Sequence, residues 1–293
     1  MASRRPSPAQ PYPINRTKDK LLRAIARYEY LSARQLTRLL YGNSETMVER
    51  NLSQLLADRY LQFVPYKDIR DDRPGGRPRR IYRLAQLGYD YVRSLGITPA
   101  GRFRAGDRGR QKALPLEHIQ QANDLIILAH RFCKQHPTFR VERFETDAEL
   151  KRHPVYFEGA GYRVGVAPDA WTLLSDGEDE YGIAWELDRA TENRTVFREK
   201  VRMLVYYSQG GYAAEFETES LTIAFVATEG GGARLDSMRS WIEAELTELG
   251  AQAVASTFLL SAFNPEEVDP GETFHSPIWS QPFANQPVPL VER

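Results

Sequence analysis

Residues 166–189 contain two apolar stretches joined by an acidic turn, and this segment constrains the fold more than any other part of the chain. Pro168 and Asp169 precede the first stretch, and Glu186 and Asp188 end the second. Side chains two residues apart on a strand share a face, so Glu186 and Asp188 are expected to point the same way. If the stretches pair as a hairpin, Asp169 joins them. Hard divalent cations and phosphodiester hydrolysis both need such converging carboxylates, which makes these three residues candidate ligands.

The same residues also have a purely structural interpretation. Asp169 can simply begin a strand after Pro168, and Asp188 can form a surface ion pair or a cap with Arg189. The acidic run at residues 176–180 is expected to be a solvated hairpin tip. The spacing of these acidic residues alone therefore does not decide between metal ligands and structural groups. The helices and strands around them must decide it.

The formal net charge of zero conceals a strong asymmetry along the chain. Residues 1–112 contain 24 Lys and Arg against 10 Asp and Glu, a net of +14. Residues 113–293 contain 15 against 29, a net of −14. Such a split favours a nucleic-acid-binding segment joined to a different domain, and 293 residues suffice for two domains. The alternative is a basic half that docks on its own acidic half.

Cysteine content and hydropathy indicate a cytoplasmic protein. Cys133 is the single cysteine, so an intramolecular disulfide is excluded and a reducing compartment is expected. No apolar run reaches the roughly 18 residues that span a membrane, and the N-terminus lacks the apolar core of a signal peptide. We expect no membrane partner.

The basic half begins with a proline-rich arm at residues 1–15, which is expected to be disordered. Apolar spacing then predicts a helix over 18–28, a short helix capped by Ser32, and a third helix capped by Ser44. The third helix is expected to bury its leucines. It would leave outward Thr46, Glu49, Arg50 and Ser53.

Two predicted strands, at 60–66 and 80–84, flank a turn rich in glycine, proline and arginine, and a helix follows from residue 85. Residues 16–96 resemble a winged helix-turn-helix domain. The resemblance implies binding to double-stranded DNA, with the third helix in the major groove. Thr46, Arg50 and Ser53 would then face bases, and the phosphate contacts would come from Arg73, Arg77, Arg79 and Arg80. The alternative role for such a module is dimerisation or protein docking.

A basic linker at 97–113 leads to the acidic half, where helix and strand patterns alternate. The predicted order is a helix at 115–135, strands at 139–144, 162–174 and 182–187, a helix at 195–208, a strand at 221–227, a helix at 233–249 and a strand at 254–263. This order resembles the PD-(D/E)xK nuclease-like fold, an α/β fold with a mixed sheet, over 114–264. The proline-rich tail at 265–293 is expected to wrap the surface or to be disordered.

The nuclease-like resemblance implies roles for particular residues. Asp169 and Glu186 match the acidic pair that would hold Mg²⁺ or Mn²⁺, and Glu117 can match an acidic residue on the first helix. The fold's pattern places lysine two residues after the Glu, but this chain has Asp188 there. Lys200, on the next predicted helix, is the best candidate for a migrated lysine. Without a cation at that point the domain would be degenerate and would need no metal.

At finer grain the chain is similar to the replication-relaxation family over roughly residues 17–230. The motifs that carry this similarity are His118, Asn123-Asp124, Pro168-Asp169, Glu186-Leu-Asp-Arg189 and Tyr206-Tyr207. The family implies replication or transfer of a plasmid or mobile element, with a homodimer or a larger complex as the working assembly.

Three functions remain open from the sequence. The first is a DNA-binding protein of plasmid or mobile-element replication with a degenerate nuclease-like domain. The second is a metal-dependent endonuclease or nickase that uses Asp169 and Glu186, alone or within recombination machinery. The third is a winged-helix transcriptional or assembly regulator whose α/β domain binds proteins.

Overall fold

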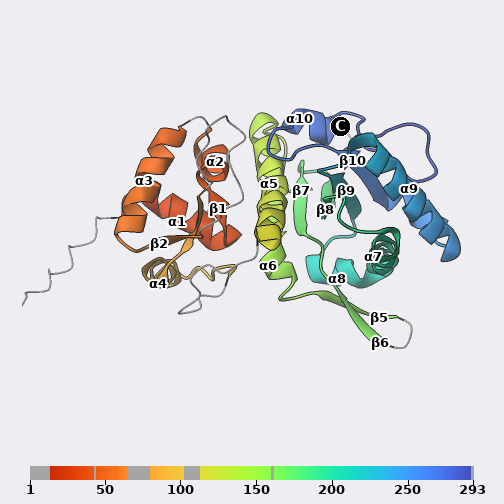
Figure 1. Ribbon diagram of the computed structural model, residues 1–293, viewed down its shortest axis with the longest axis horizontal. Coiled ribbons are helices and arrows are strands. Elements are labelled where there is room, and N and C mark those ends of the chain that lie inside the picture. The colour runs from red at the N-terminus through yellow and green to blue at the C-terminus, as the bar shows by residue number, and fades with distance from the viewer. Residues whose placement is uncertain (1–13, 43, 65–79, 102–112, 160–161, 292–293) are drawn as a thin grey trace, which may run out of the picture. The chain divides into compact units, whose positions relative to one another are not determined.

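The computed structural model of the chain describes residues 14–42, 44–64, 80–101, 113–159 and 162–291 (Figure 1). The chain divides into two compact units, residues 1–113 and residues 114–293. Residues 1–13 of the arm predicted at 1–15, most of the basic linker, and Arg73, Arg77 and Arg79 lie outside the described residues. Asn15, at the end of the predicted arm, instead caps α1 (Arg16–Tyr28).

The N-terminal unit combines short helices with a small antiparallel sheet. In chain order its elements are α1 (Arg16–Tyr28), β1 (Leu31–Ser32), α2 (Ala33–Leu36), η1 (Thr37–Tyr41), α3 (Glu45–Ala57), β2 (Leu61–Val64), β3 (Ile81–Leu84) and α4 (Gln86–Ser94). The strands pair in the order β1-β3-β2. The helices and the β2–β3 pair follow the predicted order, whereas the two-residue strand β1 was not predicted.

Helix caps in this unit agree with the sequence in one case and differ in another. Ser32 caps α2 in a reciprocal capping box with Gln35, as predicted. Ser44 occupies the cap position of α3, but its side chain makes no capping hydrogen bond. Its φ and ψ of −104° and 60° depart from the extended conformation in which a capping oxygen reaches the first free N–H groups. Ser44 therefore stands at the predicted cap position, but the prediction that its side chain caps the helix is wrong.

The packing of α4 explains one glycine of the sequence. A Cβ atom at Gly88 would lie 2.1 Å from the carbonyl oxygen of Tyr60. That carbonyl also accepts a hydrogen bond from the N–H of Ala85, the residue before α4, at 2.9 Å. Glycine is thus required where the helix approaches the chain that leads into β2.

The C-terminal unit is built around a mixed five-stranded sheet with the order β10-β9-β8-β7-β4. Strands β8, β9 and β10 run parallel, and β7 pairs antiparallel with both β8 and β4. The predicted mixed-sheet α/β fold is confirmed. In chain order the elements are α5 (Ala113–Gln135), β4 (Arg140–Thr146), α6 (Asp147–Leu150), β5 (Val155–Gly159), β6 (Tyr162–Val166), β7 (Ala170–Ser175), β8 (Glu180–Asp188), α7 (Arg194–Tyr206), η2 (Tyr207–Gly211), α8 (Tyr212–Phe216), β9 (Thr222–Ala227), α9 (Gly231–Glu248), η3 (Gln252–Thr257), β10 (Phe258–Ala262) and α10 (Pro270–His275).

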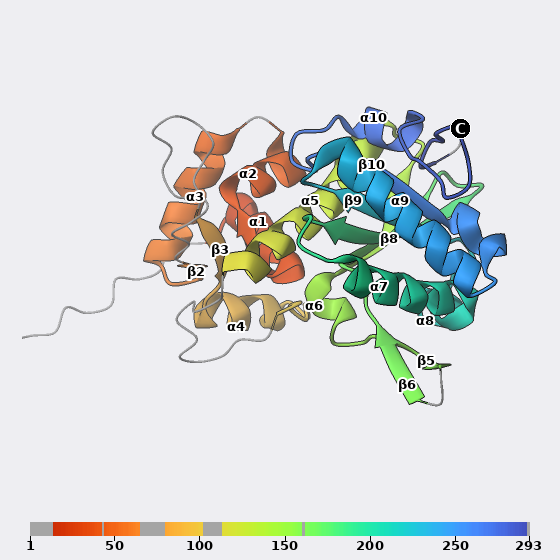
Figure 2. The ribbon, with the colours of Figure 1, turned by 45° about the vertical axis from the view of Figure 1, so that its right-hand side comes forward.

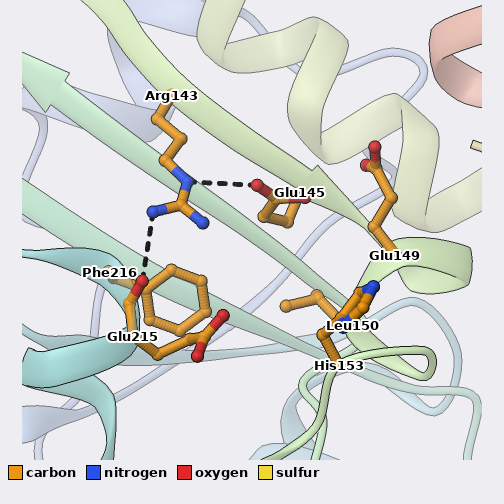
Figure 3. Close-up of a pocket in the computed structure, with 7 residues that line it drawn as sticks. All are labelled: Arg143, Glu145, Glu149, Leu150, His153, Glu215 and Phe216. Atoms are coloured by element: carbon orange, nitrogen blue, oxygen red, sulfur yellow. Dashed lines mark hydrogen bonds and ion pairs between the residues drawn. The ribbon is translucent and has the colours of Figure 1, made fainter. Parts of the chain in front are cut away.

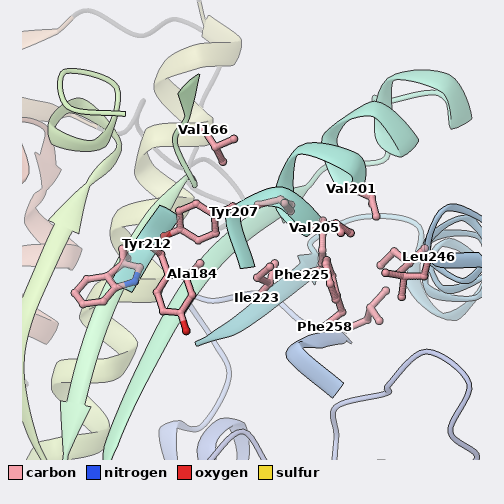
Figure 4. Packing of buried hydrophobic residues seen from close by; sticks show 14 of the residues in the cluster. Val166, Ala184, Val201, Val205, Tyr207, Tyr212, Ile223, Phe225, Leu246 and Phe258 are labelled. Atoms are coloured by element: carbon pink, nitrogen blue, oxygen red, sulfur yellow. The ribbon is translucent and has the colours of Figure 1, made fainter. Parts of the chain in front are cut away.

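Helices cover both faces of this sheet (Figures 1 and 2). On one face α7 and α9 pack against the strands through a continuous apolar core (Figure 4). Val201 and Val205 of α7 and Leu246 of α9 meet Phe225 and Phe258 of the sheet there. On the other face lie α5 and α10, so the central strands are buried on both sides.

One predicted strand, residues 162–174, is two strands in the structure. Residues 162–166 form β6, which pairs only with β5 in a separate ribbon, and residues 170–175 form β7 of the main sheet. Pro168 lies in the break, where its missing N–H cannot continue a ladder of hydrogen bonds. Strand β5 and the short α6 were not predicted either.

The predicted Pro-rich tail is in fact a packed part of the C-terminal unit. Asp269 caps α10, and Phe274 on this helix stacks on Phe132 of α5 with ring centroids 4.4 Å apart. Trp279 is fully buried, and Ser280 bridges to Leu260 of β10. The segment is ordered because its aromatic side chains cover apolar surface on the α5 side of the sheet.

Among the residues that the structure describes, no helix combines the length and the apolar character needed to cross a bilayer.

Candidate acidic site

Asp169 lies at the break between β6 and β7, where the chain enters the sheet. Its N–H donates to the carbonyl of Trp185 at 3.0 Å, and its Oδ2 accepts from the N–H of Leu187 at 2.8 Å. Its Oδ1 lies 2.7 Å from Nε2 of His118 on α5. Burial by itself would raise the pKa of Asp169, but the hydrogen bond and charge of His118, followed by the charge of Lys200, lower it below its usual value. Asp169 is therefore ionised at neutral pH.

Glu186, near the end of β8, is 4% exposed and faces α7. Burial raises the pKa of its carboxyl to about 8, and the charge of Asp169 adds to the effect against the opposing charge of Lys200. The pKa of Glu186 is thus raised above its usual value, whereas that of Asp169 is lowered. The two carboxyl groups of the predicted acidic pair differ in the direction of their pKa shifts.

Lys200 lies where a migrated lysine was predicted. Its Nζ is 3.4 Å from Oε2 of Glu186 and 2.9 Å from Oε1 of Glu192. Helix α7 begins at an Asn193 cap, whose side chain accepts from the N–H of Val196 at 3.1 Å, and this fixes the turn that carries Lys200 over the sheet. The arrangement brings a cation to Glu186.

Asp188 does not join Asp169 and Glu186 as a free carboxylate. Its two oxygens accept hydrogen bonds from Nε and an Nη of Arg234 on α9, at 2.7 and 2.6 Å, and Oδ1 also accepts from the N–H of Ala190. Asp188 is 2% exposed, so this bidentate pair is buried. The predicted metal set of Asp169, Glu186 and Asp188 does not fit a hard divalent cation as it stands, because both Asp188 oxygens are occupied by Arg234.

Glu117, the predicted acidic residue of the first helix, is also engaged. Its Oε2 lies 2.5 Å from an Nη of Arg189, and the same guanidinium is 3.6 Å from Glu229. Of the structural alternatives for Asp188, the ion pair with Arg189 does not form: Asp188 pairs with Arg234, and Arg189 pairs with Glu117. Asp188 does cap the following turn, because its Oδ1 accepts from the N–H of Ala190.

The structure also brings together two residues that sequence reasoning did not place in the site. The ligand atoms of His118, Asp147 and Asp169 all lie within 4.8 Å of one another, a spacing from which a metal ion can be held. In the sequence, His118 stands out only as part of a family motif. Asp147 had no signal, because Thr146-Asp-Ala-Glu149 is typical of a helix start, and it does form a capping box.

In the N-terminal unit, α3 presents the predicted polar face. Thr46, Arg50 and Ser53 are exposed, while Val48 and Leu52 are buried. Glu49 is also exposed on α3, and Arg80 is exposed just before β3.

A small pocket of about 90 Å³ lies beside α6 and α8 (Figure 3). Arg143 crosses it, donating to Glu145 at 3.0 Å and to the carbonyl of Glu215 at 3.1 Å. His153 and Phe216 also line it. Its lining includes neither Asp169 nor any other member of the predicted acidic site, so the pocket adds no ligand to that site.

The chain matches the model of one protein family. The model described as replication-relaxation matches residues 22–218, about two thirds of the sequence. The chain belongs to the replication-relaxation family. The match confirms the resemblance and spans both units, from α1 to the end of α8. The search of curated proteins returned no match for this replication-relaxation protein.

Two solved structures resemble the replication-relaxation chain weakly. The structure of restriction endonuclease FokI has a TM-score of 0.24 and 12% identity, covering 85% of this chain and 42% of FokI. The structure of FokI bound to DNA gives a TM-score of 0.22 and 11% identity, covering 85% of this chain and 48% of that one. The chain thus spans less than half the length of either. At such TM-scores the likeness carries no argument, and the fold assignment rests on the strand order of the sheet.

Proposed function

We propose that this replication-relaxation protein binds double-stranded DNA during replication or transfer of a plasmid or mobile element. In this proposal the N-terminal unit is a winged helix that contacts DNA, and the nuclease-like unit does not cleave it. The buried Asp188–Arg234 pair is the observation that carries the second half of the proposal.

The DNA-binding half rests on the surface of α3 and on the charge of the N-terminal segment. An exposed helix face carrying Thr46, Arg50 and Ser53 offers hydroxyl and guanidinium donors of the kind that read base edges in the major groove. The net charge of +14 over residues 1–112 supplies the sequence-independent attraction to phosphates.

The non-cleaving half rests on the chemistry around β8. Hydrolysis of a phosphodiester needs ionised carboxylates and a cation free to stabilise the developing charge. Here Asp188 is saturated by Arg234, burial raises the pKa of the Glu186 carboxyl, and Lys200 is shared between Glu186 and Glu192. These contacts support a nuclease-like domain kept for binding or assembly.

The binding proposal predicts a salt-dependent affinity for duplex DNA. The logarithm of the association constant should fall linearly with the logarithm of salt concentration, and a variant with Arg77, Arg79 and Arg80 changed to Ala should show a shallower slope, by about 0.9 for each phosphate contact removed. Arg50→Ala should weaken binding and reduce sequence preference. Fluorescence anisotropy with labelled duplexes measures both effects.

The matched control for this experiment is Arg93→Ala, which removes an exposed arginine of the same unit from α4. It should leave the slope unchanged if α3 and the segment before β3 make the contacts. An unaltered slope in the triple variant would instead indicate that this segment docks on protein, which favours the regulator interpretation.

A metal-dependent endonuclease or nickase is the second candidate, and the position of Lys200 favours it. The ammonium lies 3.4 Å from Glu186 and lowers the pKa of Asp169, so a cation and two carboxyl groups share one end of the sheet. In this alternative Asp169 and Glu186 would act on the scissile phosphate with Lys200 beside it, in the presence of Mg²⁺ or Mn²⁺.

Incubation of supercoiled plasmid with the full chain and Mn²⁺ separates the two candidates. We expect no conversion to open circles above the level of an Asp169→Ala variant prepared identically. Nicking by the wild type that is lost in both Asp169→Ala and Lys200→Ala would establish the endonuclease and remove the non-cleaving proposal.

A further inference from the structure

The geometry points to a binding site for one divalent transition-metal ion formed by His118, Asp147 and Asp169. This inference goes beyond the proposed function, because it places the ion on a different set of ligands from the predicted Asp169, Glu186 and Asp188. It requires neither DNA binding nor DNA cleavage.

The three side chains come from three separate elements of the C-terminal unit. His118 lies on α5, Asp147 begins α6, and Asp169 precedes β7. Their convergence within 4.8 Å is therefore a product of the tertiary fold and not of local sequence. Nε2 of His118 and Oδ1 of Asp169 already face each other at 2.7 Å, so small side-chain rotations open room for an ion between them.

A cationic group already pairs with one of the three proposed ligands, Asp147. Nζ of Lys151 lies 2.6 Å from Oδ1 of Asp147, which is itself 7% exposed. The Lys151 side chain is 61% exposed, so it can return to solvent when a metal ion takes its place. A buried carboxylate paired with a solvent-exposed lysine is thus available as a ligand at little cost.

The donor set selects the class of metal. One imidazole nitrogen with two carboxylate oxygens suits Zn²⁺ or Mn²⁺, whereas Mg²⁺ and Ca²⁺ prefer oxygen ligands alone. Three protein ligands also leave at least one coordination position for water or another ligand. Asp169 can bind the ion through Oδ1 while its Oδ2 remains hydrogen-bonded to the N–H of Leu187. That hydrogen bond orients the carboxylate.

Isothermal titration of the full, metal-free chain with Zn²⁺, Mn²⁺ and Mg²⁺ tests the site, with native mass spectrometry to count ions. We expect one Zn²⁺ or Mn²⁺ per chain, with Mg²⁺ bound far more weakly. His118→Asn and Asp147→Asn should each weaken Zn²⁺ binding at least about tenfold, since even outer partners of metal sites cost that much. The matched controls His153→Asn and Glu145→Gln should bind as the wild type does.

The competing ligand set is addressed by Glu186→Gln. Zn²⁺ binding that falls with this variant but not with His118→Asn would place the ion at the predicted acidic pair and overturn the inference. X-ray absorption at the zinc edge of the loaded wild-type chain needs no variant: an imidazole in the first shell supports the site, and a shell without imidazole contradicts it. None of these readouts depends on DNA, so they can succeed or fail independently of the proposed function.

Discussion

Replacing Asp188 with alanine is expected to destabilise the C-terminal unit by about 3–5 kcal/mol. The substitution leaves the Arg234 guanidinium, of which only 11% is exposed, without the carboxylate that accepts both of its short hydrogen bonds. An uncompensated charge in that position costs far more than the loss of an exposed ion pair. Denaturation by urea, followed by tryptophan fluorescence, reports this unit selectively, because all four tryptophans of the chain lie after residue 170.

Two variants control this experiment. Glu142→Ala removes the partner of Arg140 in an exposed ion pair on β4 and should cost less than about 1 kcal/mol. Replacing the pair together, Asp188→Leu with Arg234→Met, should recover most of the lost stability, since apolar residues of similar volume need no counter-charge. If Asp188→Ala unfolds at the same urea concentration as Glu142→Ala, the pair is solvated and the argument for a closed site fails.

Replacing Trp279 with alanine should destabilise the same unit by about 3–5 kcal/mol, although the residue lies in a segment that looks like a tail in sequence. Its indole is fully buried, its ring centroid lies 6.3 Å from that of Trp185, and its Nε1 donates to the carbonyl of Thr273 at 2.8 Å. The variant loses apolar burial, leaves a cavity and removes a buried hydrogen bond. Chemical denaturation measures the change through the three remaining tryptophans.

Phe283→Ala is the natural comparison, because Phe283 lies in the same segment but is 50% exposed. Its removal should change the stability by no more than about 0.5 kcal/mol. Equal effects of the two substitutions would mean that the segment contributes little to the core, and residues beyond 265 would then be a dispensable tail.

Apolar periodicity was sufficient to predict most of the fold. Helices such as α5 and α7 have clear periods, buried strands such as β9 are short continuous apolar runs, and their order identifies the mixed sheet. Periodicity could not show that residues 162–174 serve two different partners, because strand pairing is a tertiary property. Periodicity also did not predict that Trp279 is buried in the core. The segment around it is proline-rich, and such a composition is typical of both loops and disorder.

The acidic site was harder to predict for a different reason. Spacing along one strand predicts that Glu186 and Asp188 share a face, because that relation depends only on the alternation of a strand. Lys200, the candidate on the following helix, lies 3.4 Å from Glu186. The fate of Asp188 depends on Arg234, 46 residues further on, and Asp147 reaches His118 only through the packing of α6 against the sheet. Partners at such separations are set by tertiary packing and leave no periodic mark in the sequence.

The position of Arg234 also bears on which residues the second compact unit needs. The family match ends at residue 218, before β9, yet Arg234 donates both to Asp188 and to the carbonyl of Glu192, whose carboxylate contacts Lys200. A fragment cut at the end of the matched segment would therefore lose the strand beside β8 and the counter-charge of a residue inside the match. The segment by which the family is recognised therefore ends inside the compact second unit, and we expect a fragment of that unit to fold only if it extends through residue 291.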